Sequence, residues 1–412
     1  MLHRKVIIAI ADGIGDRPIA ELDDKTPLEY ADTPNLDRVA SAGINGMMDP
    51  IAPGIPVGTD MGHLILFGYE PQDYPGRGPI EALGVGMEVQ PGDIVLRCNY
   101  ATVDSSGIVL DRRAGRIREG TDRIAETISG IEIDGVTFYL KSATEHRAVL
   151  VLRGTGLSDR IGDSDPKAPN DGSPYHKVKP LDDSDEAKRT AAVLNRFLQE
   201  AHRLLSRHPV NEARVQRGEK PANFILTRGV GRMTELTPIS ERLNIRGSCI
   251  AGESTVLGVA KLAGFKPVTD SRMTANMDTD IELKAELALR ELADCDLVLV
   301  HMKAPDLKGH DNEPLEKAKA VELFDRLVGL LLRDMPEDAY LALAADHSTP
   351  CEVGEHSGEP VPIAICGPGI RKDRVLHYNE CDGGYGGLGR LSGMDFVRTL
   401  HDLMGRVKKK GN

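Results

Sequence analysis

The chain has 412 residues, with 51 Lys or Arg against 63 Asp or Glu, so its formal net charge is −12. At 40% hydrophobic residues it can bury a sizeable core, and its length suggests two or three domains. The acidic balance disfavours general binding to nucleic acid or to an anionic membrane, so an anionic substrate must be attracted by a local group of cations.

The cysteines and the N-terminus indicate the compartment. Six cysteines are scattered along the chain without a CxxC pair, which fits free thiols in a reducing environment. The opening MLHRKVIIAIADG has an apolar run too short for a signal sequence and lacks a small-residue cleavage site. Since no stretch reaches the roughly 18 apolar residues of a membrane helix, we expect a cytoplasmic protein.

The first predicted element is a strand over KVIIAIA, which ends at Asp12. Further on, the segment PVGTDMGHLILFGYEP (56–71) places Thr59 in a loop bounded by Gly and Pro, just ahead of a helix that we expect to begin near Met61. The simplest interpretation of Thr59, followed by Asp60, is a helix cap. A hydroxyl in this position could also serve as a nucleophile, depending on what gathers around it.

The middle of the chain has a different pattern. From about residue 73 it carries Gly-rich turns, two facing strand-like runs (TFYLKSAT and HRAVLVLRG), a polar loop over 162–174 and a long helical pattern over 185–207. We therefore predict an inserted α+β substrate-binding domain over 73–237. Residues 1–72 and 238–412 would form the metal-binding, phosphatase-like domain.

The C-terminal half returns to buried strands and helices. DLVLVHM, AYLALAADH and VPIAICGPG are apolar runs typical of strands buried on both faces, and helices are predicted over 280–293 and 314–332. This alternation predicts an α/β fold with an open, mostly parallel sheet sandwiched by helices.

Potential metal ligands follow three of these strands. Because the carboxyl ends of parallel strands share one edge of a sheet, these side chains could converge there, with one more from a later loop. They are Asp12, Asp306 with His310, Asp346 with His347, and His356. Such a set suits Zn²⁺ or Mn²⁺ and is large enough for two ions, which would make the Thr59 hydroxyl a phosphoryl acceptor. Singly, each residue is also an ordinary cap or surface pair.

Cations that could hold a phosphorylated substrate occur in the predicted inserted domain. They are Arg112, Arg113 and Arg116 in DRRAGRI, and Arg147 and Arg153 in EHRAVLVLRG. Arginine binds phosphate and carboxylate with two parallel hydrogen bonds, although a solvated basic face explains the same pattern. His146 is a candidate general acid or base, with a structural histidine as the alternative.

Several motifs together resemble one family, the archaeal-type, cofactor-independent phosphoglycerate mutases of the alkaline phosphatase superfamily. They are DGIGDRPIAEL, KTPLEYADTPNLD, GRGPIEALGVG, DRRAGRI, HPVNEAR, GHDNEP, DHSTPCEVGEHSG and YGGLGR, spread nearly end to end. The resemblance implies an isomerase of glycolysis and gluconeogenesis that exchanges 3-phosphoglycerate and 2-phosphoglycerate in a ping-pong reaction. It also implies two divalent ions, Mn²⁺ or Zn²⁺ with Co²⁺ or Mg²⁺ as alternatives.

The resemblance further implies how the predicted metal ligands are shared between the two ions. One ion would be held by Asp12, Thr59, Asp346 and His347, and the other by Asp306, His310 and His356. The expected partner is a small phosphorylated acid, with no nucleic acid and no membrane, and a homo-oligomer is left open.

The chain departs from the family pattern at several positions. Thr59 replaces the usual serine, and Met61-Gly62 stand where Thr-Ala is usual. Glu145 replaces a glycine and Lys167 a histidine, while Leu257 lies near where a lysine is usual. These changes keep three alternatives open. The chain could transfer or hydrolyse phosphate on another phosphorylated or phosphonate hydroxy acid, act as a homoserine kinase-like enzyme, or be a silent binding protein.

Overall fold

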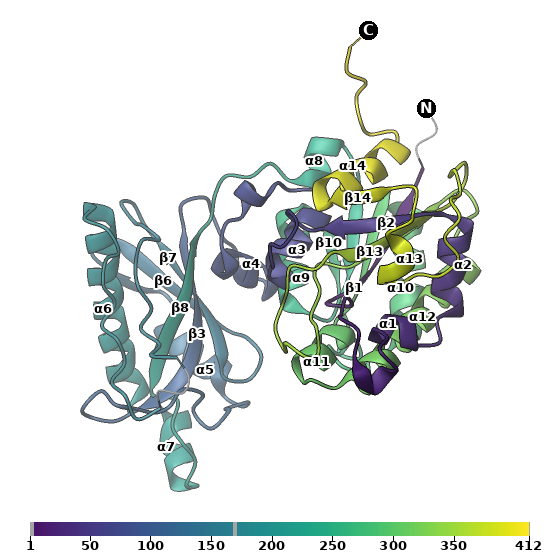
Figure 1. The fold of residues 1–412 in the computed structure, drawn as a ribbon. Coiled ribbons are helices and arrows are strands. Elements are labelled where there is room, and N and C mark those ends of the chain that lie inside the picture. Colours follow the sequence, from purple (N-terminus) through teal and green to yellow (C-terminus); the bar gives the residue numbers. More distant parts are fainter. Residues whose placement is uncertain (1–3, 168–170, 412) are drawn as a thin grey trace. The chain divides into compact units, whose positions relative to one another are not determined.

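The computed structural model describes residues 4–167 and 171–411 and divides into two compact units (Figure 1). One unit comprises Met1–Tyr74 and Thr237–Asn412, and the other Pro75–Leu236. Part of the loop that we expected over 162–174, residues 168–170, lies outside the described residues.

The first unit is built on an eight-stranded sheet with the order β10-β9-β11-β1-β12-β13-β2-β14. Its strands are β1 (Val6–Ala11), β2 (Ile44–Asp49), β9 (Gly247–Ile250), β10 (Lys266–Val268), β11 (Leu297–Met302), β12 (Tyr340–Ala344), β13 (Val361–Cys366) and β14 (Gly389–Ser392). β1 lies between β11 and β12 and is parallel to both. Every residue of β1 is buried, as its uninterrupted apolar sequence predicts.

The sheet is mixed, because β13 runs antiparallel to both β12 and β2. Antiparallel neighbours need no helical crossover. The segment from β12 to β13 can therefore be an irregular loop, and it carries His347 and His356. The predicted fold class, α/β with a mostly parallel sheet, is confirmed, with this antiparallel strand as a detail that the sequence pattern did not indicate.

Helices cover both faces of this sheet (Figure 1). They are α1 (Pro27–Tyr30), α2 (Pro34–Ala42), α3 (Thr59–Leu66), α8 (Ile239–Leu243), α9 (Ser254–Leu262), α10 (Ile281–Asp294), α11 (Ala304–His310), α12 (Pro314–Asp334), α13 (Glu380–Gly383) and α14 (Gly393–Leu403), with short 3₁₀ turns at Ala20–Leu22 and Pro71–Asp73. The helix α12 packs against α1, α2, α10 and α11, whereas α3 packs against α9 and α14. The helices expected over 280–293 and 314–332 correspond to α10 and α12.

The second unit contains an antiparallel sheet with the order β4-β3-β7-β6-β5, and β8 pairs with β3. Its strands are β3 (Ile94–Val103), β4 (Val109–Asp111), β5 (Ile131–Ile133), β6 (Val136–Ser142), β7 (Arg147–Arg153) and β8 (Phe224–Arg232). Its helices are α4 (Arg77–Gly84), α5 (Thr121–Ile128), α6 (Asp185–Leu205) and α7 (Pro209–Gln216). The amphipathic α6 contributes Leu194, Phe197 and Leu198 to the main core, where Phe197 stacks on Phe138 of β6.

None of the described helices combines the length and the apolar character that a membrane crossing requires.

Candidate metal centre and active site

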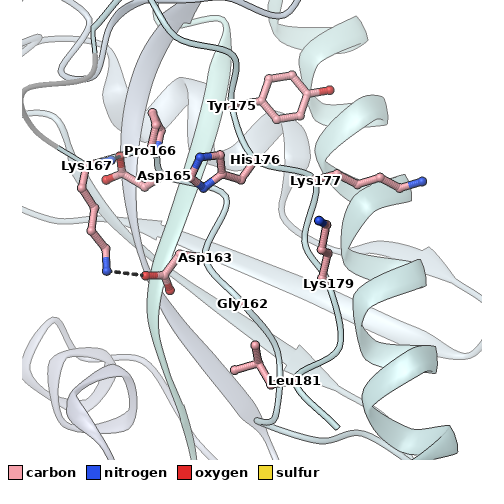
Figure 2. Close-up of a pocket in the computed structure, with 10 residues that line it drawn as sticks. All are labelled: Gly162, Asp163, Asp165, Pro166, Lys167, Tyr175, His176, Lys177, Lys179 and Leu181. Carbon is pink, nitrogen blue, oxygen red and sulfur yellow. Dashed lines mark hydrogen bonds and ion pairs between the residues drawn. The ribbon is translucent and has the colours of Figure 1, made fainter. Parts of the chain in front are cut away.

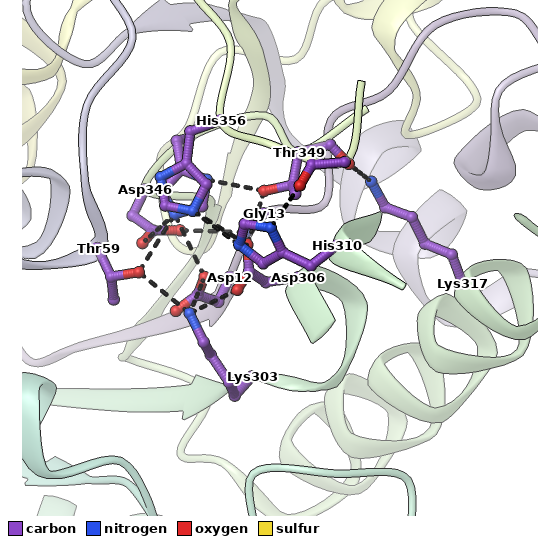
Figure 3. A network of polar contacts seen from close by, with 12 residues as sticks. Asp12, Gly13, Thr59, Lys303, Asp306, His310, Lys317, Asp346, Thr349 and His356 are labelled. Atoms are coloured by element: carbon purple, nitrogen blue, oxygen red, sulfur yellow. Dashed lines mark hydrogen bonds and ion pairs between the residues drawn. The ribbon is translucent and has the colours of Figure 1, made fainter. Parts of the chain in front are cut away.

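The ends of the central strands bring the predicted metal ligands of the first unit together (Figure 3). Asp12 directly follows β1, Asp346 and His347 follow β12, and Asp306 lies in α11, just beyond β11. His310 ends α11 and His356 lies in the loop before β13. Thr59 is the first residue of α3, whose N-cap is Gly58, so its hydroxyl does not cap the helix as the simplest interpretation expected.

One group of side chains surrounds the Thr59 hydroxyl. Its Oγ1 is 3.3 Å from Nε2 of His347. The same Nε2 lies 3.4 Å from Oδ1 of Asp12 and 3.2 Å from Oδ2 of Asp346. Asp12, Asp346 and His347 are fully buried and offer ligand atoms within 4.8 Å of one another. This geometry suits a cation with oxygen and nitrogen ligands.

A second group consists of Asp306, His310 and His356. Both histidine Nε2 atoms lie 3.4 Å from Oδ1 of Asp306 and 3.2 Å from each other. Each Nδ1 is 2.8 Å from a backbone carbonyl, that of Gly354 for His310 and that of Val57 for His356. Since a carbonyl only accepts, each Nδ1 carries a proton, and the two Nε2 atoms are left directed at Asp306 and at each other. A shared cation would relieve this arrangement.

The buried charge also fits metal binding. Asp12, Asp306 and Asp346 are at most 1% exposed. Among the described residues, no donor forms a hydrogen bond of normal geometry with Oδ2 of Asp346. Burial alone would raise the pKa of Asp346, but His347 and His63 outweigh it and hold the pKa well below its usual range. Buried ionised carboxylates require compensating cations, so the residues present fit divalent metal ions.

The two groups are joined by residues that sequence reasoning missed. Thr349 Oγ1 donates a hydrogen bond to Oδ1 of Asp306 (2.7 Å) and lies 3.1 Å from Nδ1 of His347. The ammonium of Lys303 contacts Asp12, Asp306 and Thr59 at 2.7–3.0 Å. In the sequence, the one indication that Lys303 belongs to this centre is its position three residues before Asp306, at the end of a buried strand.

Two further buried histidines contact the carboxylates of Asp12 and Asp346. Nε2 of His301 is 2.8 Å from Oδ2 of Asp12, and Nδ1 of His63 lies 3.2 Å from Oδ2 of Asp346. His301 is embedded in an apolar strand, where its sequence context resembles that of a core residue. Such contacts can orient ligands, and Asp12, His63 and His301 also offer ligand atoms within 4.8 Å of one another.

A glycine allows the loop after β1 to approach this centre closely. Gly13 has φ +62°, and its N–H donates to Oδ1 of Asp346 at 3.2 Å. A Cβ at this position would lie 2.5 Å from Thr349 Oγ1 and 2.7 Å from Asp306. Both the backbone conformation and the space therefore require glycine here.

The second unit holds a cationic pocket of about 420 Å³. Its lining residues are Asn99, Arg112, Arg113, Arg116, Glu145, His146, Arg147, Lys167 and Arg228. Four of the five predicted substrate arginines are thus brought together, and Arg228 of β8 is an addition that sequence reasoning missed. With six cations and one carboxylate on its wall, the pocket suits a small anion.

The arginines of this unit are not equivalent. Arg112 is held by a bidentate pair with Asp165 at 2.7 and 2.8 Å, so its guanidinium is already committed. Arg153 lies at the opposite end of β7 from Arg147, outside the pocket lining, and pairs with Asp93 at 2.7 Å. The structure therefore does not bring Arg153 to this pocket.

His146 lies against the wall of the cationic pocket. Burial, with Arg147 and Arg113 next in importance, lowers the pKa of His146 to about 4. Its Nδ1 is buried and has no hydrogen-bond partner among the described residues. The imidazole is therefore neutral near pH 7 and can accept a proton once an anion offsets the arginines.

Two of the departures noted in the sequence, Glu145 and Lys167, line this pocket. Glu145 adopts φ +56° and pairs with Arg118 at 2.7 Å. Lys167 pairs with Asp163 at 3.1 Å and also lines a neighbouring cavity of about 630 Å³ (Figure 2). That cavity is larger but has fewer cations than the arginine pocket, and no predicted site residue lines it. Leu257 is buried in α9.

Comparisons with known proteins agree with one another. The family model described as 2,3-bisphosphoglycerate-independent phosphoglycerate mutase matches residues 40–211. The chain is 47% identical to the protein of that name from Methanopyrus kandleri, over 100% of this chain and 99% of the relative. It is 46% identical to "2,3-bisphosphoglycerate-independent phosphoglycerate mutase 1" of Methanothermobacter thermautotrophicus, over 99% of this chain and 100% of that one.

Two solved structures extend this likeness to the fold. The PH0037 protein from Pyrococcus horikoshii superposes with a TM-score of 0.86 at 37% identity, with complete coverage of both chains. The cofactor-independent phosphoglycerate mutase from Thermoplasma acidophilum superposes with a TM-score of 0.74 at 35% identity, covering 98% of this chain and 100% of that one. On this evidence the chain belongs to the family of 2,3-bisphosphoglycerate-independent phosphoglycerate mutases.

Proposed function

We propose that this protein interconverts 3-phosphoglycerate and 2-phosphoglycerate through a phosphoenzyme formed at Thr59. The observation that carries the proposal is the environment of the Thr59 hydroxyl. Its Oγ1 lies 3.3 Å from His347 Nε2 and 3.0 Å from Lys303 Nζ, next to three buried carboxylates. A hydroxyl that accepts a hydrogen bond from an ammonium group and lies among metal-binding side chains is well suited to accept a phosphoryl group.

The side chains that would hold two divalent ions fall into the two groups described above. Asp12, Thr59, Asp346 and His347 would bind one ion, and Asp306, His310 and His356 the other. Mixed nitrogen and oxygen ligands favour Zn²⁺ or Mn²⁺. Ions bound there would supply Lewis acidity and positive charge for phosphoryl transfer.

The chain's own residues account for the transfer itself. The Oγ1 of Thr59 forms a bond to phosphorus as the phosphorus–oxygen bond of the substrate ester breaks. Thr59 loses its hydroxyl proton, and the departing alcohol oxygen of glycerate gains one, so atoms and charge balance. The return transfer to the other hydroxyl of glycerate regenerates Thr59 and completes the isomerisation.

The arginine pocket of the second unit would hold the anionic groups of the substrate. Arg113, Arg116, Arg147 and Arg228 would bind carboxylate or phosphate oxygens. His146, neutral in the free protein, would take a proton from, or return it to, a hydroxyl of a substrate bound in this pocket. Arg112 would position the wall of the pocket through Asp165.

Glu145 favours a second candidate, phosphoryl transfer on a related phosphorylated hydroxy acid or an amino-alcohol acceptor. Its carboxylate lies in a pocket that is otherwise cationic, where it repels phosphate but can accept a hydrogen bond from a hydroxyl or an amine. Formation of a phosphorylated product other than 2-phosphoglycerate, with a phosphoenzyme still formed at Thr59, would favour this candidate over the mutase.

A phosphorus NMR time course with 3-phosphoglycerate and Mn²⁺, with a chelated control, tests the proposal. Formation of 2-phosphoglycerate without free phosphate supports mutase activity. Release of inorganic phosphate, or no change, would favour another substrate. Intact-mass analysis of quenched enzyme should show one added phosphoryl group in the wild type and none in Thr59→Ala, whereas Thr59→Ser should remain active. Turnover by Thr59→Ala would reject Thr59 as the acceptor.

A further inference from the structure

We propose that Lys303 is a catalytic residue whose ammonium group binds the acceptor oxygen of Thr59 and supplies a fixed positive charge at the point of phosphoryl transfer. This inference rests on the proposed function, because it takes Thr59 as the acceptor. Lys303 is distinct from the metal-ligand set and from the substrate arginines.

All three N–H donors of the Lys303 ammonium have partners in this centre (Figure 3). They are Oδ1 of Asp12 at 3.0 Å, Oγ1 of Thr59 at 3.0 Å and Oδ2 of Asp306 at 2.7 Å. Asp12 and Thr59 come from segments at least 244 residues away, whereas Asp306 lies three residues after Lys303. An ammonium with this set of contacts is oriented by the fold, unlike a lysine on a solvated surface.

Its position is also held by its own backbone. Lys303 is the N-cap residue of α11, directly after β11, and its side chain is only 13% exposed. A lysine ammonium is positively charged in its ordinary state, and here two buried carboxylates lie within 3.0 Å of it.

Charge neutralisation alone does not account for the Thr59 contact. Asp12 and Asp306 could hold the ammonium without the threonine, and each has another partner: His301 Nε2 lies 2.8 Å from Asp12, and Thr349 Oγ1 lies 2.7 Å from Asp306. A hydrogen bond from an ammonium to Thr59 Oγ1 strengthens as that oxygen loses its proton and gains negative charge. Such a contact stabilises the transition state more than the ground state.

The role in the reaction follows from the balanced step. When Oγ1 of Thr59 bonds to phosphorus and the ester bond breaks, negative charge passes across the phosphoryl oxygens to the departing oxygen. The Lys303 ammonium, within hydrogen-bond distance of Oγ1, lies beside this charge in both directions of transfer. Preorganised donors of this kind typically contribute a factor of about 10²–10³ to the rate.

The test compares Lys303→Met with Lys308→Met, a matched control on the same helix whose ammonium binds Glu313 at 2.7 Å. Rapid-quench intact-mass analysis measures phosphoenzyme formation, and plasma mass spectrometry measures bound Mn²⁺. We expect Lys303→Met to form phosphoenzyme about 10²–10³-fold more slowly with its metal content unchanged. Lys308→Met should match the wild type. If Lys303→Met does not fold, Lys303→Gln, which keeps a donor but no charge, should show at least a tenfold loss.

Two results would overturn the inference. One is phosphoenzyme formation by Lys303→Met within about fivefold of the wild type. The other is a loss of bound metal that excess Mn²⁺ reverses together with the rate, because the lysine would then only organise the ligands. Thr59→Ala, assayed in parallel, separates the two proposals: turnover by that variant rejects the acceptor, whereas an inactive Thr59→Ala beside a fully active Lys303→Met rejects only the role of the lysine.

Discussion

Lys317 offers a direct test of what holds the metal-binding loops in place. Its ammonium is completely buried in the first unit and binds Oδ2 of Asp16 at 2.9 Å. It also donates to the carbonyls of Gly15 at 3.1 Å and Thr349 at 2.9 Å. One side chain of α12 thus ties the loop after β1 to the loop after β12. We expect Lys317→Met to destabilise this unit strongly.

The magnitude follows from what the substitution leaves behind. Removal of one partner from a buried ion pair typically costs about 3–5 kcal/mol, because the other charge stays buried. Asp16 keeps hydrogen bonds from the backbone N–H groups of Arg17 and Cys351, which reduces that cost. Two carbonyls lose a donor, which costs about 1 kcal/mol or more each. The net expectation is about 4 kcal/mol, a fall in Tm of roughly 10 °C.

Urea unfolding followed by circular dichroism would measure this loss, with Lys319→Met as the control. Lys319 lies on the same helix, is 60% exposed and pairs with Glu316, so its replacement should leave the unfolding free energy almost unchanged. A loss below about 1 kcal/mol in Lys317→Met would refute the reasoning, since the buried charge would then have no structural consequence.

Three further predictions concern metal binding, pH and substrate. Gly13→Ala should weaken Mn²⁺ binding at least about tenfold in a titration, because the new methyl group would displace Asp306. Burial, with two nearby arginines, lowers the pKa of His401 to about 4, below 6.5 in the unfolded chain. The unfolded state therefore takes up the proton first as pH falls from 6.5 towards 4, and the wild type should lose about 3 kcal/mol more stability over that window than His401→Gln. Arg147→Met should raise KM for phosphoglycerate roughly tenfold or more, whereas Arg153→Met should not.

Each of these three predictions has an experimental result that would contradict it. Unchanged Mn²⁺ affinity in Gly13→Ala would show that the loop after β1 can move without disturbing the ligands. Parallel pH profiles for the wild type and His401→Gln would mean that this histidine is protonated equally in the folded and unfolded states. Equal KM changes for the two arginine variants would remove the basis for assigning the substrate to the pocket.

Much of the fold was readable from hydrophobic pattern. Continuous apolar runs such as that of β1 indicated strands buried on both faces, and the confirmed α/β class follows from their alternation with helices. The antiparallel direction of β13 was not readable, because a buried strand has the same pattern in either direction. Strand direction depends on whether the connecting segment crosses the sheet, and a long irregular loop leaves that open.

The sequence alone determined which residue types follow the strands, and therefore which side chains could converge at one edge of the sheet. Only the tertiary structure decided the distances among them, including the 3.2 Å between His310 and His356 and the contact of Lys303 with Thr59. It also separated Arg153 from the arginines that line the pocket and added Arg228 to them. The physical reason is that side-chain chemistry is local to the chain, whereas the neighbours that direct it come from segments hundreds of residues apart and meet only when the sheets form.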